Sequence, residues 1–377
     1  MNKLSVFLIV VLSFTSVQTF AFDSKFKGFI ALDLLNAKKE KNEVQQLSTG
    51  IGTFDLKFYA KHDKTSMKIK LDLDDSDIGS KYKIFEEAQM SYNITKELRL
   101  LGGKGKVRFH QMRYGVINSH YVDGGSILGT NHSFRDQDNK ILVGLRFGSY
   151  SKGFLNHFTL YGESEIPKLD RDDNVEVSDS GVVETVNTKT FSTDQQRGIA
   201  NKLEWFMSKE TKMSFALLYF YADYRPKETY AADWAGTYKK SGLEVFWEYS
   251  YAQVSTHPYD KYSTKDQDEH IAQIGFEKYL TDKWNLLASM DYAFVDSQRH
   301  TQQLANGKPS RNDGYQYETT TYKFGVGTKY KMSKSSFITI GTEFEAQDNV
   351  ATDTAGVEVS DENLHAYLVG ADLAFWF

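Results

Sequence analysis

The sequence predicts an all-β protein, a transmembrane antiparallel β-barrel of about 16 strands, within a range of roughly 14–18, that has short turns at one end and long loops at the other. Three observations predict it: apolar and polar residues alternate with period two, short and long polar links alternate, and the composition is that of strands. The 377 residues include 26 Phe, 23 Tyr and 27 Gly but only 4 Pro. A chain rich in aromatic residues and poor in proline favours strands over helices.

Charge and cysteine content exclude several classes of protein. The chain has 45 Lys and Arg against 50 Asp and Glu, which gives a formal net charge of −5. The chain therefore lacks the excess of positive charge that would indicate a nucleic-acid partner. The absence of Cys excludes a disulfide scaffold, a Cys-based zinc site and a thiol nucleophile.

Residues 1–21 have the features of a secretory signal peptide. Lys3 precedes an apolar run over 4–17, and Thr19-Phe20-Ala21 offers small residues at a cleavage site. The alternative is a membrane anchor helix, but the run is shorter than the ~20 residues that a spanning helix needs. We therefore expect an exported chain in which 22–377 forms a single barrel domain.

Alternation with period two is clear in several segments, and it predicts strands with one apolar and one polar face. Examples are Met67, Ile69 and Leu71 against Lys68, Lys70 and Asp72; the face formed by Met213, Phe215, Leu217, Tyr219 and Tyr221; and Leu243, Val245 and Trp247 against Glu244 and Phe246. A soluble β-sandwich shows the same alternation. Many of these runs extend over ~10 residues, the length that a tilted strand needs to cross a bilayer, whereas soluble strands average about 5–6.

The polar links alternate in length, as expected for a barrel with short periplasmic turns and long extracellular loops. Short links are predicted at 61–66, 94–97, 150–153, 207–211, 248–250, 280–283 and 331–335, and long ones at 35–49, 74–82, 110–139, 163–196, 223–238, 257–269, 297–316 and 346–361. These links separate sixteen strands, and the link 163–196 has room for a hairpin. All four prolines fall in long links, where no ladder hydrogen bond is lost.

Aromatic residues gather near the short turns. The set comprises Tyr92, Trp205, Phe206, Tyr279, Trp284 and Tyr330. Such rings prefer the lipid headgroup level and form the girdles of a membrane barrel. The alternative interpretation is the core of a soluble β protein.

A family resemblance follows from these segments. The C-terminal LAFWF, which ends at Phe377, resembles the last strand of Gram-negative outer-membrane barrels, which the barrel-assembly machinery reads. The segments 87–92 with 98–109, 203–219 and 276–292 resemble hairpins of porins, general or phosphate-selective. The resemblance implies a sixteen-strand barrel, usually a homotrimer, surrounded by outer-membrane lipid and lipopolysaccharide.

The resemblance also implies a function and its limits. Porins form water-filled channels for the passive diffusion of small hydrophilic solutes and ions, without a cofactor. Phosphate selectivity is not implied, because Lys106-Val107-Arg108-Phe109-His110 lacks the Pro and Gly of that family's Lys-x-Pro-Phe-Gly motif. The Pro-Glu-Phe-Gly-Gly signature of general-porin constriction loops is absent as well.

The candidate pore-lining residues follow from the alternation. Lys68, Lys70 and Asp72 are predicted to face the lumen, and the link 110–139 is the best candidate for a loop that folds inward and narrows the pore. The candidate constriction set comprises Lys104, Lys106 and Arg108 before this loop and Arg113, Asp123, Asp136 and Asp138 within it. A basic wall opposite an acidic loop would create a transverse field that sets charge selectivity. The alternative is a solvated lumen face with no special role.

Residues for other chemistry are not indicated. No His-Glu-x-x-His, no Gly-x-Ser-x-Gly and no Walker-type Gly run occurs, so no catalytic residue, no metal site and no cofactor is predicted. The acidic run 170–173, with Glu176 and Asp179, lacks EF-hand spacing, and a solvated or lipopolysaccharide-bridging loop is favoured over a calcium site. A passive channel is the predicted function. A structural or adhesive barrel and an outer-membrane enzyme are the alternatives.

Overall fold

The computed structural model describes residues 23–40, 46–73, 85–109, 140–149, 153–163, 168–177, 183–192, 196–222, 227–256, 267–298, 316–352 and 355–377. Every regular element in these ranges is a β-strand. Within the same ranges, no helix is long and apolar enough to cross a membrane. The predicted signal peptide 1–21 lies outside the described residues.

The strands follow one another closely along the chain. They are β1 (Asp23–Glu40), β2 (Gln46–His62), β3 (Thr65–Asp72), β4 (Phe85–Asn93), β5 (Leu98–Gly105), β6 (Lys140–Gly148), β7 (Gly153–Glu163), β8 (Lys168–Val177), β9 (Val183–Ser192), β10 (Gln196–Phe206), β11 (Thr211–Ala222), β12 (Lys227–Lys240), β13 (Leu243–Thr256), β14 (Gln267–Tyr279), β15 (Trp284–Gln298), β16 (Gln316–Lys331), β17 (Ser336–Thr352) and β18 (Glu358–Trp376). None of them contains a proline.

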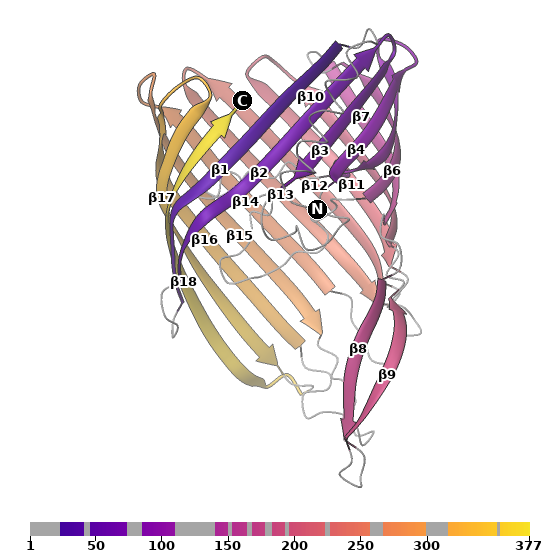
Figure 1. The fold of residues 1–377 in the computed structure, drawn as a ribbon. Helices are drawn as coiled ribbons and strands as arrows, with labels where there is room; N and C mark the ends of the chain where they lie inside the picture. Colours follow the sequence, from indigo (N-terminus) through magenta and orange to yellow (C-terminus); the bar gives the residue numbers. More distant parts are fainter. Residues whose placement is uncertain are drawn as a thin grey trace.

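All strands except β8 and β9 form one closed antiparallel barrel (Figure 1). Each strand pairs with the next along the chain, β7 pairs with β10, and β1 pairs with β18 from Phe29↔Trp376 to Glu40↔Ala366. This confirms the predicted fold and the predicted number of sixteen barrel strands. In the described barrel, every strand therefore has a paired neighbour on both sides, which is what a sheet in hydrocarbon requires.

The link 163–196 contains the remaining two strands. β8 and β9 form a separate two-stranded antiparallel sheet, paired from Lys168↔Ser192 to Val177↔Val183. Figure 1 shows this hairpin projecting beyond the barrel at the end opposite the short turns. The acidic run 170–173 therefore lies on a strand rather than in a loop.

Several connections differ from the prediction. The predicted short link 248–250 is wrong, because these residues lie inside β13, and the turn is at Ser241-Gly242. Both residues have positive φ, 52° and 72°, as in the two-residue hairpin turns that match strand twist. The long links predicted at 35–49, 223–238 and 346–361 shrink to 41–45, 223–226 and 353–357, because the strands on either side of them extend further than the alternation predicts.

The two faces of the wall differ in chemistry, as the alternation predicts. Along β6, Ile141, Val143, Leu145 and Phe147 are exposed, while Lys140, Leu142 and Gly144 between them are buried. Outward residues are apolar on most strands, and inward residues include most of the buried charged side chains. The outer face is therefore suited to lipid and the inner face to water.

The aromatic girdle is partly as predicted. Tyr92, Trp205 and Trp284 are exposed near the short turns, and the rings of Trp284 and Tyr330 lie 4.7 Å apart. The prediction is wrong for Phe206 and Tyr279, which are not part of the outer girdle. They are in register with Lys212 and Asn285, which belong to the inner face. The sequence did not distinguish these two rings from the outward ones. Neighbouring residues at a strand end alternate between the two faces, so nearness to a turn does not say which face a ring is on.

The C-terminus completes the barrel seam. Phe375 and Phe377 are exposed on the outer face. The Phe377 N–H donates to the Gly28 carbonyl at 3.0 Å, and the Gly28 N–H donates to the Phe377 carbonyl at 2.7 Å. A Cβ atom at Gly28 would lie 2.0 Å from Phe377 Cζ, so glycine allows this ring to cross the seam.

A test of the two faces compares charges placed on one strand. Phe324→Arg in β16 puts a guanidinium on the outer face, midway along the strand, where Phe324 is 53% exposed. We expect the free energy of unfolding in lipid vesicles to fall by about 2–4 kcal/mol. Thr319→Arg on the inner face of the same strand should change it by less than about 1 kcal/mol. Equal losses in urea titrations would show that the faces are assigned incorrectly.

Candidate functional site

The candidate site is the inner wall of the barrel, because the charged residues converge there. The first part is an ion-pair network on β2, β3 and β4. Lys70 Nζ lies 3.1 Å from the Asp55 carboxylate and also pairs with Glu86, while Lys57 lies 3.2 Å from Asp55 and Lys68 pairs with Glu87. A register shift after Lys70 lets the consecutive residues Glu86 and Glu87 both reach inward, as a β-bulge does. The predicted lumen residues Lys68 and Lys70 lie in this network.

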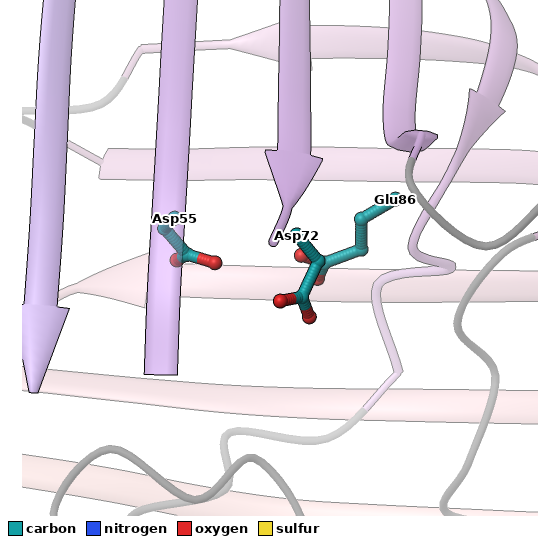
Figure 2. A group of neighbouring side chains, drawn as sticks. All are labelled: Asp55, Asp72 and Glu86. Carbon is teal, nitrogen blue, oxygen red and sulfur yellow. The ribbon is translucent and has the colours of Figure 1, made fainter. Parts of the chain in front are cut away.

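Three carboxylates of the network approach one another. Asp55, Asp72 and Glu86 each offer an oxygen within 4.8 Å of the others (Figure 2). Asp72, the third predicted lumen residue of β3, is in register with Asp55. The ammonium of Lys70 pairs with two of these carboxylates and that of Lys57 with one of them, so lysines of the wall offset most of the charge of the group. We interpret it as a structural ion-pair network rather than a metal site.

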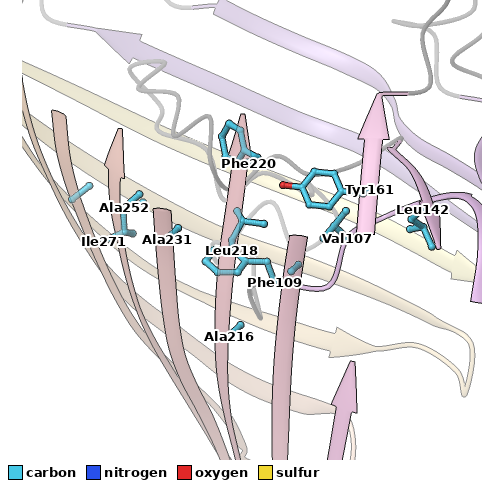
Figure 3. Packing of buried hydrophobic residues seen from close by; sticks show 12 residues of the cluster. Val107, Phe109, Leu142, Tyr161, Ala216, Leu218, Phe220, Ala231, Ala252 and Ile271 are labelled. Atoms are coloured by element: carbon cyan, nitrogen blue, oxygen red, sulfur yellow. The ribbon is translucent and has the colours of Figure 1, made fainter. Parts of the chain in front are cut away.

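The chain that follows β5 turns into the barrel. Val107 and Phe109 are 2% and 1% exposed and belong to a cluster with inward side chains of β6, β7 and β10–β15. Figure 3 shows Val107 beside Tyr161 and Phe109 beside Leu218. The segment 106–109 therefore crosses the inside of β6, β7 and β10 to reach β11. Arg108 is exposed between its two buried neighbours and interacts electrostatically with inward His157.

The structure contradicts the prediction that Lys104 belongs to the constriction set. Its register partners are Ala88 and Ile141, which are both exposed on the outer face. The prediction continued one strand through residue 109, but β5 ends at Gly105, and the chain then leaves the sheet. Lys104 therefore does not share the position of Lys106 and Arg108. Arg113, Asp123, Asp136, Asp138 and the rest of the link 110–139 lie outside the described residues.

Basic and acidic residues occupy opposite parts of the inner wall. The register places Arg99, Lys140 and Arg146 on the inner face of β5 and β6, next to the segment 106–109. The inner face of β12–β18 holds Asp233, Glu244, Glu248, Glu269, Glu277, Asp291, Glu343, Glu345 and Asp372, against Lys239, Lys323, Lys329 and Lys331. In the closed strand order, as many strands lie between β6 and β15 in one direction as between β5 and β16 in the other. The pair β5 and β6 therefore lies across the barrel from the pair β15 and β16.

The acidic wall was not identified from the sequence. Alternation alone places Glu343 and Glu345 on one face of a strand, but it does not say which strands lie opposite. The sequence predicts the acidic partner of the basic segment in the loop 110–139. That loop lies outside the described residues, and the closed strand order brings acidic residues from the second half of the chain opposite β5 and β6.

Comparisons with known proteins agree with the fold. No protein-family model matches the chain, and no curated protein matches it. Solved structures do: OmpT, an outer membrane protein of Vibrio cholerae in its trimer form, has a TM-score of 0.57 at 12% identity and covers 95% of this chain and 100% of that one. The outer membrane channel DcaP of Acinetobacter baumannii has a TM-score of 0.56 at 13% identity, covering 94% and 97%.

A further solved structure has the same likeness. An anion-selective porin from Comamonas acidovorans has a TM-score of 0.54 at 11% identity and covers 94% of this chain and 100% of that one. The chain therefore has the porin-like fold, a sixteen-strand antiparallel barrel of the outer-membrane type.

The network on β2–β4 can be tested by removing its central cation. Lys70→Met leaves Asp55 and Glu86 without their shared ammonium, and we expect the free energy of unfolding to fall by about 3–5 kcal/mol, since a buried charge loses its partner. Lys57→Met is the control, because Lys57 is more exposed and, among the described residues, forms its ion pair with Asp55, and it should cost about 0–1 kcal/mol. Similar losses in urea titrations of the two variants would contradict the central role of Lys70.

Proposed function

We propose that the protein is an outer-membrane porin, a water-filled channel for the passive diffusion of small hydrophilic solutes and ions. The observation that carries the proposal is the closed sixteen-strand barrel with a charged inner wall and an apolar outer face. A barrel of this size is wide enough for an aqueous channel, whereas eight strands enclose a space that side chains fill. Charged side chains on the inner wall keep water in that space.

The segment 106–109 supports a constriction in this channel. Val107 and Phe109 anchor the start of the link 106–139 on the inner wall, and we propose that the link continues as the loop that narrows the pore. The basic residues around this segment and the acidic wall of β12–β18 then act on solutes from opposite sides. Such an arrangement orients dipolar solutes and sets charge selectivity.

The membrane setting is part of the same proposal. A signal peptide over 1–21 exports the chain, and Phe377 at the seam serves as the signal for the barrel-assembly machinery. The outer face contacts lipid and lipopolysaccharide. One structural neighbour is described in a trimer form, which supports the homotrimer that the porin resemblance implies. No catalytic residue or cofactor is needed for this function.

Channel formation is tested by planar-bilayer recording of the purified, refolded full chain. We expect discrete conductance steps of about 1 nS in 1 M KCl, since an open barrel of this width conducts as a water-filled pore. A heat-unfolded sample of the same preparation is the control. Silence of the folded barrel would overturn the channel and favour a structural barrel that binds a partner.

Charge selectivity is tested by reversal potentials in a KCl gradient. Lys106→Gln with Arg108→Gln should raise the ratio of cation to anion permeability by ~2-fold or more, and Glu345→Gln with Asp372→Asn should lower it to a similar extent. Lys104→Gln is the matched control, because the register places Lys104 on the outer face, and it should leave the ratio unchanged. Unchanged reversal potentials in both double variants would show that the inner-wall charges do not act on ions.

A further inference from the structure

Lysines at the short-turn end of β10–β16 differ between the two faces of the wall. Three lysines on the inner face are bound to carboxylates of neighbouring strands: Lys212 to Glu204 at 2.6 Å, Lys239 to Glu244 at 3.2 Å, and Lys329 to Glu277 at 3.3 Å. These ion pairs balance the inward charges within the protein itself.

Two further lysines at this end lie on the outer face. Lys240 at the end of β12 and Lys278 near the end of β14 are both in register with Leu243 of β13. They have the parity of the exposed side chains Trp234 and Phe276 on their own strands. Because side chains alternate along a strand, both lysines point to the same outer face as these rings.

The turn between β12 and β13 brings the two outward lysines together. The Lys278 Nζ donates to the carbonyl of Ser241, the residue after Lys240, at 3.4 Å. The Tyr279 N–H donates to the Gly242 carbonyl at 2.7 Å and holds the turn against β14. The ammonium of Lys278 therefore lies beside the residue that follows Lys240.

The protein offers this pair little negative charge. Glu210, on the turn between β10 and β11, is exposed and interacts electrostatically with both Lys240 and Lys209. Within the part of the chain that the structure describes, the ammonium of Lys278 has the Ser241 carbonyl as its partner and no carboxylate. Two neighbouring ammonium groups on the outer face therefore share a fraction of one exposed carboxylate, whereas the inward lysines have carboxylates of their own.

We propose that Lys240 and Lys278 bind the phosphodiester of an anionic phospholipid, such as phosphatidylglycerol, in the leaflet at the short-turn end of the barrel. Ammonium groups bind phosphate oxygens through charge-assisted hydrogen bonds, and clustered lysines at a membrane surface attract anionic lipids. A zwitterionic headgroup brings a cation of its own, which the two lysines repel. The pair therefore selects a lipid with a net negative charge.

The outer face next to the lysines suits the rest of the lipid. Lys278 is in register with Leu286 of β15, and the side chains of Phe276, Trp284 and Leu286 are exposed on this side of the barrel. Aromatic rings of this kind lie at the headgroup level, and apolar side chains contact the acyl chains. The lipid site rests on the membrane setting of the proposed function and not on conduction through the barrel.

The test is native mass spectrometry of the folded full chain in detergent micelles that hold equal amounts of phosphatidylglycerol and phosphatidylcholine with the same acyl chains. We expect the protein to retain phosphatidylglycerol ~20-fold more often, since each lysine near a membrane surface favours an anionic lipid by a factor of about 5. Lys240→Gln and Lys278→Gln should each lower this preference by ~5-fold. The double variant should retain the two lipids equally.

Two further variants serve as controls. Lys239→Gln with Lys329→Gln removes the same amount of charge from the inner face at the same end of the barrel, and it should keep the preference of the unaltered protein. Lys240→Arg with Lys278→Arg keeps both outward charges and should keep it as well. The heat-modifiable electrophoretic shift of a folded barrel verifies that each variant folds.

The outcomes separate the lipid site from the channel. Equal retention of the two lipids by the unaltered protein, or an equal loss of preference in the inner-face control, would overturn the site. Displacement of the bound phosphatidylglycerol by glycerol 3-phosphate would make a soluble phosphate the occupant and overturn the lipid. Conductance in planar bilayers without a lipid preference would remove the site alone, and a lipid preference in a silent barrel would remove the channel alone.

Discussion

Closure of the backbone hydrogen-bond ladder between the first and last strands is the constraint on which the rest of the structure depends. In hydrocarbon no water is present to satisfy an open strand edge, so a sheet that spans a membrane must end where it begins. The chain meets this condition by pairing β1 with both β2 and β18. The backbone bonds between Gly28 and Phe377 extend the seam to the last residue.

Closure gives the period-two pattern its meaning. In an open sheet, alternation separates a core from a solvent face, whereas in this barrel it separates lipid from lumen. A Lys and a Phe that are adjacent in sequence, such as Lys323 and Phe324 in β16, therefore face opposite media. The large charged fraction of the chain is compatible with a membrane because the wall turns most of its charges inward. Ion pairs such as Lys323–Glu343 at 3.0 Å then hold the inner faces of neighbouring strands together.

The inner wall combines features that come from distant parts of the chain. The segment 106–109 lies against apolar side chains of β6, β7 and β10–β15 and presents Arg108 to the interior. Carboxylates accumulate on the second half of the barrel, around the side opposite β5 and β6. The proposed charge field across the lumen arises from this arrangement. Its basic and its acidic residues come from different halves of the sequence.

Local pattern in the sequence determined the fold class, the number of barrel strands and the face of most residues, because alternation and turn composition are local properties. It placed Lys68, Lys70 and Asp72 correctly with respect to Met67 and its neighbours. It misplaced the turn at Ser241-Gly242, since polar strand residues resemble loops. Only the tertiary structure decided that β5 ends before Lys106, that Lys104 lies outside, and which carboxylates stand together. Those facts depend on where the chain leaves the sheet and on which strands closure brings side by side, and neither is encoded within a single strand.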